Sequence, residues 1–304
     1  MSETESGSEG KTRSLQADPR FRARPGTLYV VATPLGNLRD VTLRALDVLA
    51  TADVVAAEDT RLAAILLKHY GLMPRMLSLH AHNEAQRAEA LVGRLREGRS
   101  VALVTDAGTP AISDPGARLV RAARDAGFAV VPVPGPSAVA AAVSAAGLAA
   151  RAFVFAGFPP AQPKARRAWL ASLSAAPGAI VFYEAPHRVR ASVEDLLAAF
   201  GPVRRLVVAR ELTKAFETIA AMPLGEAPTW LAQDANRERG EFVLIVDQAD
   251  DEPAHAALGP DAERWLAALL AELPPARAAR VVSAVTGVAR DAVYARALAI
   301  KPRA

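Results

Sequence analysis

Acidic and histidine side chains stand at the ends of several short apolar runs, where they could take or give a proton. Glu58 and Asp59 follow one such run, and Glu184 follows another. His80 and His82 are two positions apart, which places both on one face of a predicted strand. A metal held by these histidines would need further ligands. Glu58 and Asp59 could instead cap the predicted helix that follows them.

The stretch from Asp106 to Gly116 combines turn-forming and small polar residues directly after a predicted buried strand. Pro110 and Pro115 cannot continue a strand, so the backbone must turn and leave N–H groups free to bind a ligand. In α/β sheets, ligands bind at the carboxyl ends of strands. Two further Pro/Gly loops, at 34–37 and 134–137, also follow predicted strands. The alternative interpretation is a plain surface connection.

Apolar runs alternate with segments of helical spacing through the first half of the chain. Strands are predicted over 28–33, 53–57, 76–80, 101–105 and 129–133, and helices over 41–49, 61–69, 84–96, 115–126 and, after the third Pro/Gly loop, 137–150. This alternation predicts an α/β domain, a doubly wound parallel sheet covered by helices on both faces.

The pattern changes after about Arg151. Strands are predicted over 153–158, 180–183, 206–210, 216–220 and 242–246, with one helix near 192–200, which is typical of a mixed α/β domain. Helical patterns at 261–273 and 276–299 are separated by Pro274-Pro275. The predicted division is a disordered leader (1–26), an N-terminal α/β domain (27–150), a second mixed α/β domain (151–249), a linker (250–260) and a small C-terminal helical appendix (261–304).

Bulk composition narrows the class of protein. With 304 residues and 51% hydrophobic content, the chain can form two domains with cores of their own. It has no cysteine, which excludes a disulfide framework, a thiolate nucleophile and Cys-ligated metals, and makes the cytoplasm the expected location. The leader lacks the apolar segment of a signal peptide, and no membrane partner is expected. A net charge of +4 permits a polyanionic partner but is weak evidence for one. Lys164, Arg166 and Arg167 form a basic cluster in a predicted loop.

No phosphate-binding glycine motif accompanies the three loops. Gly-x-Gly does not occur in the sequence, which argues against a dinucleotide site. Gly10-Lys11-Thr12 lies in the leader, and Glu5 stands where a P-loop has its first glycine, so this match is due to chance. The loops therefore suit a cofactor held by backbone contacts and by shape.

Seven segments, in order along the chain, resemble the bacterial small-subunit ribosomal RNA methyltransferase I family of the tetrapyrrole-methylase superfamily. They are 32–37, 57–61, 80–84, 106–116, 132–137, 182–188 and 209–214. The likeness runs from about Leu28 to Val246, and the C-terminal helices resemble the helical tail of the same family. The resemblance implies a tetrapyrrole-methylase-like fold. It also implies methyl transfer from S-adenosylmethionine to the ribose 2′-hydroxyl of a decoding-centre cytidine in 16S RNA, with no metal.

The resemblance also implies roles for individual residues. The three loops and one aromatic residue of the second domain would surround the cofactor: Pro34, Leu35, Gly36, Asp106, Ala107, Gly108, Thr109, Ile112, Ser113, Gly135, Pro136, Ser137 and Tyr183. Because a ribose hydroxyl is a poor nucleophile, a base should lie beside it, and the candidates are Glu58, Asp59, His80 and Glu184. For Asp106, a simple turn cap is the alternative.

Six basic residues are candidates for binding RNA: Arg61, His82, His187, Arg188, Arg210 and Lys214. A planar guanidinium binds phosphate through two parallel hydrogen bonds, although each arginine could instead pair with a nearby carboxylate. The implied partners are 16S ribosomal RNA, within the small ribosomal subunit, and a second copy of the chain.

The sequence is also compatible with three other functions. The first is a methylase of small tetrapyrrole-like molecules on the same scaffold. The second is a metal-dependent hydrolase built on His80, His82, Asp106 and Asp114, which would bind a divalent metal tightly. The third is a non-catalytic RNA-binding protein, which would bind RNA without turnover.

Overall fold

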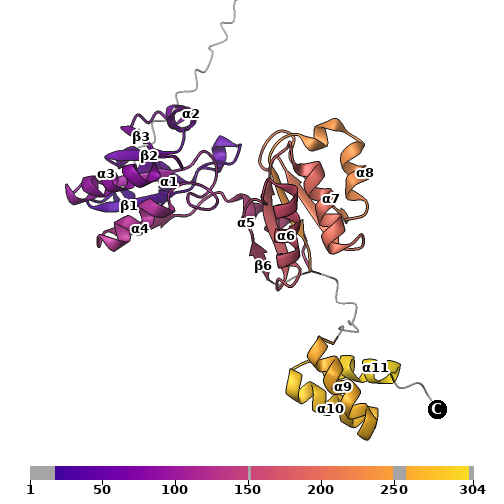
Figure 1. Ribbon diagram of the computed structural model, residues 1–304. Helices are drawn as coiled ribbons and strands as arrows, with labels where there is room; N and C mark the ends of the chain where they lie inside the picture. Colours follow the sequence, from indigo (N-terminus) through magenta and orange to yellow (C-terminus); the bar gives the residue numbers. More distant parts are fainter. Residues whose placement is uncertain (1–17, 150–151, 249–257, 301–304) are drawn as a thin grey trace, which may run out of the picture. The chain divides into compact units, whose positions relative to one another are not determined.

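The computed structural model describes residues 18–149, 152–248 and 258–300 (Figure 1). The chain forms two compact units, Met1–Gln248 and Ala249–Ala304. Most of the predicted leader and linker, with residues 150, 151 and 301–304, lies outside the described residues. Within the leader, residues 18–26 contain a 3-10 helix, η1 (Pro19–Phe21), and the Asp18 N–H donates to Asp47 Oδ1 at 2.9 Å.

The first sheet has five parallel strands in the order β3-β2-β4-β1-β5. They are β1 (Thr27–Val31), β2 (Val54–Ala57), β3 (Met76–Ser78), β4 (Val101–Val104) and β5 (Ala129–Val133). The three inner strands are rich in valine, leucine and alanine and are almost fully buried, as expected of a parallel sheet covered on both faces. Since all strands are parallel, their carboxyl ends meet at one edge.

Helices cover both faces of this sheet. The helices α3 (Glu84–Arg96) and α4 (Ala117–Asp125) pack on one face. The helices α1 (Leu43–Thr51) and α2 (Thr60–His69) pack on the other, and a 3-10 helix, η2 (Leu38–Asp40), precedes α1. The Thr42 hydroxyl caps α1 by accepting from the Ala45 N–H at 3.1 Å.

The second sheet is mixed and has the strand order β6-β7-β10-β8-β9. Its strands are β6 (Phe153–Phe155), β7 (Ala179–Glu184), β8 (Arg205–Arg210), β9 (Thr218–Pro223) and β10 (Phe242–Val246), with only the β6–β7 pair parallel. The helices α6 (Pro163–Leu173), α7 (Val189–Phe200) and α8 (Ala227–Ala232) cover one face, and η3 (Ala235–Glu238) precedes β10. The helix α5 (Ala138–Ala145) follows β5 in the chain but packs on the other face of the second sheet, which joins the two sheets in one unit.

The second unit has three helices around their own core: α9 (Pro260–Glu272), α10 (Pro275–Thr286) and α11 (Arg290–Ile300). Gly287, at φ +73°, ends α10 in the left-handed conformation. The predicted class, an α/β chain with a parallel sheet, a second mixed sheet and C-terminal helices, is confirmed. Within the described residues, every helix is too short or too polar to cross a membrane.

Three local predictions were wrong. His80 and His82 do not share a strand face, because β3 ends at Ser78 and the His80 N–H donates to the Asn83 side chain at 2.9 Å within a turn. The segment 276–299 is divided into α10 and α11. The basic residues 164–167 lie on α6 rather than in a loop, because Pro163 favours the first turn of a helix.

Candidate active site

The three Pro/Gly loops are hydrogen-bonded to one another at the carboxyl edge of the first sheet. They follow β1, β4 and β5, which are neighbours in the sheet. Thr33 and Gly108 exchange backbone N–H···O bonds of 2.9 and 3.0 Å. The Thr109 hydroxyl donates to the Pro136 carbonyl at 3.0 Å. The loops therefore hold one another in place.

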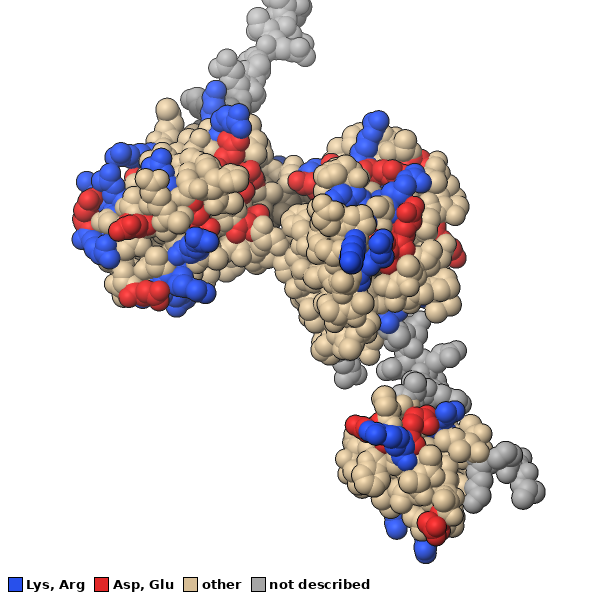
Figure 2. Space-filling view, viewed as in Figure 1, with Lys and Arg blue, Asp and Glu red and all other residues tan. Residues whose placement is uncertain are grey.

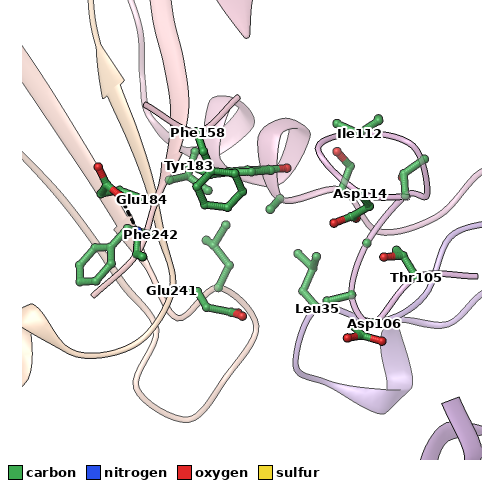
Figure 3. A pocket seen from close by; sticks show the side chains of 18 of the residues that line it. Leu35, Thr105, Asp106, Ile112, Asp114, Phe158, Tyr183, Glu184, Glu241 and Phe242 are labelled. Carbon is green, nitrogen blue, oxygen red and sulfur yellow. Dashed lines mark hydrogen bonds between the residues drawn. The ribbon is translucent and has the colours of Figure 1, made fainter. Parts of the chain in front are cut away.

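A cavity of about 410 Å³ lies between these loops and the second sheet (Figure 3). Tyr183 and Phe158 reach across it toward the loop that carries Ile112 and Asp114. The lining residues are Leu35, Glu58, Thr105, Asp106, Ala107, Gly108, Thr109, Ile112, Asp114, Ser137, Ala138, Phe158, Tyr183, Glu184, Ala185, Pro186, Leu212, Glu241, Phe242 and Val243.

Strained backbone is concentrated in two loops that line the cavity. Among the described residues, the non-glycine residues with positive φ are Ala111 (66°), Ser113 (65°), Glu211 (52°) and Thr213 (67°). This conformation costs an L-residue about 1–2 kcal/mol, so the surrounding structure must impose it. Such strain is typical of loops that position a ligand.

Glycine allows the loop 211–214 to approach the first sheet. A Cβ at Gly36 would lie 2.3 Å from Lys214 Cγ, closer than atoms can approach. The Lys214 ammonium binds Glu211 Oε1 at 2.8 Å and Glu241 Oε2 at 2.9 Å. Burial lowers the pKa of Lys214, but the hydrogen bonds to the two carboxylates outweigh this and raise it. The lysine thus fixes the loop against Gly36.

Carboxylates gather on the side of the cavity formed by the first sheet. The Thr105 hydroxyl donates to Glu58 Oε2 at 2.8 Å, and Asp106 Oδ1 accepts from the Asp59 N–H at 2.9 Å. Burial raises the pKa of Asp114 to about 6; the nearby Thr105 hydroxyl opposes this, and the charges of Glu58 and Asp106 add to it. An acid with this pKa can exchange a proton near neutral pH.

The opposite side of the cavity is aromatic. The Tyr183 ring makes edge-to-face contacts with Phe155 at 4.9 Å and Phe158 at 5.4 Å between centroids. Burial raises the pKa of the Tyr183 hydroxyl, and the charge of Asp114 raises it further. The cavity therefore combines an acidic side with an apolar aromatic side.

The predicted catalytic residues lie in different surroundings. Glu58 lines the cavity, whereas Asp59 caps α2 and binds Arg61 at 2.6 Å, a hydrogen bond that lowers the pKa of Asp59 to about 2. Glu184 borders the cavity, but its carboxylate is fully buried, binds Arg188 at 2.6 Å and accepts from Ser192. His80 lies outside the lining, and its Nδ1 is buried without a partner.

Most of the predicted cofactor-binding residues line the cavity: Leu35, Asp106, Ala107, Gly108, Thr109, Ile112, Ser137 and Tyr183. The others, Pro34, Gly36, Ser113, Gly135 and Pro136, belong to the same loops without lining it. Their roles stay predictions.

The predicted RNA-binding residues lie outside the cavity lining. Arg61 is bound to Asp59, and Arg188 to Glu184. Arg210 is only 8% exposed and donates to the carbonyls of Arg239 and Phe216, and Lys214 holds two carboxylates. His82 and His187 are exposed. Here too the roles stay predictions.

Sequence reasoning did not select several lining residues. Phe158, Leu212 and the segment 241–243 come from the second sheet and its loops, so only the tertiary fold brings them to the cavity. The sequence suggests Asp114 only as a ligand of the alternative metal site, although it stands in the Pro/Gly stretch 106–116. Among the described residues, no three His, Asp or Glu side chains are arranged to hold a metal ion.

The fold of the first unit is that of the tetrapyrrole methylases. Residues 27–228 match the family described as Tetrapyrrole (Corrin/Porphyrin) Methylases. Two solved structures have the same fold. Uroporphyrin-III-C-methyltransferase from Thermus thermophilus has a TM-score of 0.52 and 24% identity, and covers 73% of this chain and 94% of its own. Cobalt precorrin-4 methyltransferase has a TM-score of 0.55 and 19% identity, and covers 73% of this chain and 95% of its own.

The relatives found by sequence indicate a narrower family than the fold does. Ribosomal RNA small subunit methyltransferase I of Escherichia coli O157:H7 is 50% identical over 277 residues, 90% of this chain and 95% of its own. The protein of the same name from Pseudomonas aeruginosa is 47% identical over 273 residues, 90% of this chain and 97% of its own. Residues 256–301 match the RsmI C-terminal HTH domain. The chain belongs to the ribosomal RNA small subunit methyltransferase I family, within the tetrapyrrole methylases, and is a methyltransferase.

Proposed function

We propose that this enzyme transfers a methyl group from S-adenosylmethionine to the ribose 2′-hydroxyl of a decoding-centre cytidine in 16S ribosomal RNA. The observation that carries the proposal is a cavity at the carboxyl edge of a methylase sheet, acidic on one side and aromatic on the other. Relatives about half identical over nearly the whole chain are named as small-subunit ribosomal RNA methyltransferases.

The residues present fit S-adenosylmethionine, which supplies a methyl group on a positively charged sulfur. The lining holds three carboxylates, Glu58, Asp106 and Asp114, besides the ion-paired Glu184 and Glu241, and among the described residues no Lys, Arg or His, so it favours a cation. Tyr183 and Phe158 offer faces on which an adenine ring can pack. At Gly108, a Cβ would lie 3.2 Å from Leu35 Cδ2, so the absence of a side chain keeps this part of the loop open.

The side chains of the chain itself would align the two reactants and take up the proton. We assign Asp114 as the group that accepts the 2′-hydroxyl proton, because it is half-buried on the cavity lining. S-adenosylmethionine, held by the loops that carry Leu35, Gly108 and Thr109, would supply its methyl carbon to the ribose oxygen, and its sulfur would keep the electron pair of the broken carbon–sulfur bond. Thr105, placed between Glu58 and Asp114, would orient the two carboxylates.

The partners follow from this reaction. The substrate is 16S RNA, which we place within the small ribosomal subunit, and the enzyme would then act in the cytoplasm. The C-terminal unit, which matches a helix-turn-helix family, would contribute to holding RNA. We also propose a homodimer, which light scattering would contradict by a purely monomeric profile at working concentration.

The test is label transfer from radiolabelled S-adenosylmethionine to purified 30S subunits and to naked 16S RNA, both from cells that lack this enzyme. Label on a cytidine ribose in the decoding region is expected. Cofactor binding by calorimetry without label on either RNA would favour a methylase of small molecules. Absence of cofactor binding would contradict the assignment of the cavity.

A further inference from the structure

The cavity cannot hold the RNA phosphates itself. Among the described residues, its lining carries no cationic side chain, and its carboxylates Glu58, Asp106 and Asp114 add to Glu184 and Glu241, which pair with cations outside the lining. These carboxylates repel a phosphate backbone, whereas most of the affinity of proteins for RNA comes from Lys and Arg bound to phosphates. Under the proposed function, the cations that hold RNA must therefore lie outside the cavity.

The cations expected to do so are largely engaged within the protein. Arg61 binds Asp59 through Nε and Nη2, and Arg188 binds the buried Glu184. Lys214 lies between two carboxylates. Each would have to give up an internal ion pair in order to bind a phosphate. Exposed cations without such partners are better placed.

Four exposed arginines on α3 and α4 have no such partners: Arg87, Arg118, Arg121 and Arg124, here called the arginine stripe. Within the described part of the chain, no side-chain hydrogen bond or ion pair engages them. Three of them recur every third residue along α4, opposite its buried residues Leu119 and Ala123. Two exposed acids, Glu89 and Asp125, lie on the same helices. Figure 2 shows blue side chains, with fewer red ones, over α3 and α4.

The stripe begins next to the cavity. Asp114 lines the cavity, and α4 starts three residues later. Glu84 Oε1 accepts from the N–H groups of Gly116 and Arg118, both at 2.9 Å, which fixes the start of α4 beside the start of α3. From Arg118 to Arg124 the stripe extends about 9 Å along the helix, at about 1.5 Å per residue.

We infer that the arginine stripe on α3 and α4 binds the phosphate backbone of the RNA strand whose nucleotide enters the cavity. The inference rests on the proposed function, because it takes RNA as the substrate. The stripe would position the RNA without reading its sequence, since phosphate contacts carry no base information.

The test compares charge-neutral and charge-keeping variants in RNA binding at several salt concentrations. The triple variant Arg118→Gln/Arg121→Gln/Arg124→Gln removes three phosphate contacts. The logarithm of the RNA-binding constant falls linearly with the logarithm of the salt concentration, and each phosphate contact to a single strand adds about 0.7 to the steepness of this slope. Removal of three contacts should therefore make the slope less steep by about 2. Binding to 16S RNA at 0.1 M salt should weaken by about tenfold to a hundredfold. The variant Arg118→Lys/Arg121→Lys/Arg124→Lys should keep most of the slope.

A matched control removes the same charge elsewhere on the first unit. Arg24, Lys68 and Arg75 are exposed and form no ion pair among the described residues, so Arg24→Gln/Lys68→Gln/Arg75→Gln should change the slope little. An equal loss of RNA binding in both Gln variants would overturn the inference, because it would indicate that RNA is attracted by the overall positive charge of the protein and not by the arginine stripe. Loss of binding to 30S subunits but not to naked 16S RNA would also overturn it, because it would indicate a protein partner.

Failure of this inference is distinguishable from failure of the proposed function. The unaltered enzyme could label 16S RNA while the Gln stripe variant binds RNA with the same affinity as the unaltered enzyme. In that case only the assignment of the stripe is wrong. If the unaltered enzyme labels neither RNA, the proposed function is wrong. Calorimetric binding of S-adenosylmethionine to the Gln stripe variant should equal that of the unaltered protein, which checks that the cavity is intact.

Discussion

Asp114 carries the acid–base chemistry proposed for the cavity, and its pKa of about 6 predicts a pH dependence. Below that value the carboxyl is protonated and cannot accept a proton, so kcat/KM should fall about tenfold per pH unit. Asp114→Asn should lower kcat by about a hundredfold or more and remove this acidic limb. Steady-state methyl transfer measured from pH 5 to 9 checks both.

The variant Glu58→Gln tests the same pH dependence by changing a neighbour of Asp114 and leaving Asp114 itself in place. Because the charge of Glu58 raises the pKa of Asp114, removal of that charge should move the acidic limb of the pH profile to lower pH.

The folded-state pKa of Asp114 lies above its unfolded value, so the charged form of Asp114 lowers the stability of the fold above pH 6. Asp114→Asn should therefore be at least as stable as the unaltered protein at pH 8, with the difference lost as pH falls toward 4. An unchanged acidic limb in Asp114→Asn would contradict its assignment as the base.

Glu184 has surroundings that favour a structural role. Its carboxylate is fully buried and holds Arg188, so Glu184→Ala leaves a largely buried guanidinium without its partner. We expect the free energy of unfolding to fall by about 3 kcal/mol. Urea denaturation measures this. Glu97→Ala, which breaks the exposed pair with Arg94, should change it by less than about 1 kcal/mol. Equal effects in the two variants would show that the Glu184 pair contributes no more than a surface pair.

Sequence reasoning at the residue scale found the loops but not the surroundings of each side chain. The Pro/Gly stretches predicted turns, because proline fixes φ and glycine permits the positive φ that many turns require. The burial of Asp114 and Glu184 depends on residues far along the chain, which local patterns do not contain. The prediction that His80 and His82 share a strand face failed because Asn83 binds the backbone and ends the strand early.

At the scale of elements, the loop 211–214 and the loop after β1 act together. Gly36→Ala would place a methyl group 2.3 Å from Lys214 Cγ, so the lysine and its strained loop must shift. We expect binding of S-adenosylmethionine to weaken by about tenfold or more, because Leu35 and Leu212 line the cavity. Calorimetry measures the change.

The double variant Gly36→Ala/Lys214→Ala separates a steric cause from a backbone one. It removes the clash, so cofactor binding should recover to that of Lys214→Ala alone. No recovery would show that Gly36 acts through its backbone rather than through the space that it leaves for Lys214.

Some elements were predicted at their observed bounds and others were missed. The sequence period placed α3, β5 and β10 at their observed bounds. The helices α6 and α8 were missed, and Arg166 was placed in a loop, because a buried arginine resembles a surface residue in sequence. In the structure Arg166 binds Asp195 at 2.7 Å and is almost fully buried.

At the scale of the whole molecule, the cavity depends on how the two sheets are joined. The helix α5 leaves β5 of the first sheet and packs on the second, where Val139 and Ala142 contact its core. The fold class followed from alternating strands and helices, but the strand orders did not, since many orders fit the same pattern. Both sheets belong to one compact unit, Met1–Gln248. The predicted domain boundary at residue 150 therefore stays a prediction.

The most direct test of the central claim is mass spectrometry of 16S ribosomal RNA from cells that lack this gene and are complemented with it. The unaltered gene is predicted to restore 2′-O-methylcytidine in the decoding region, and a gene carrying Asp114→Asn, expressed at the same level, to leave it unmethylated. Full methylation by the Asp114→Asn enzyme would contradict the assignment of the base. Absence of 2′-O-methylcytidine with the unaltered gene would contradict the proposed reaction itself.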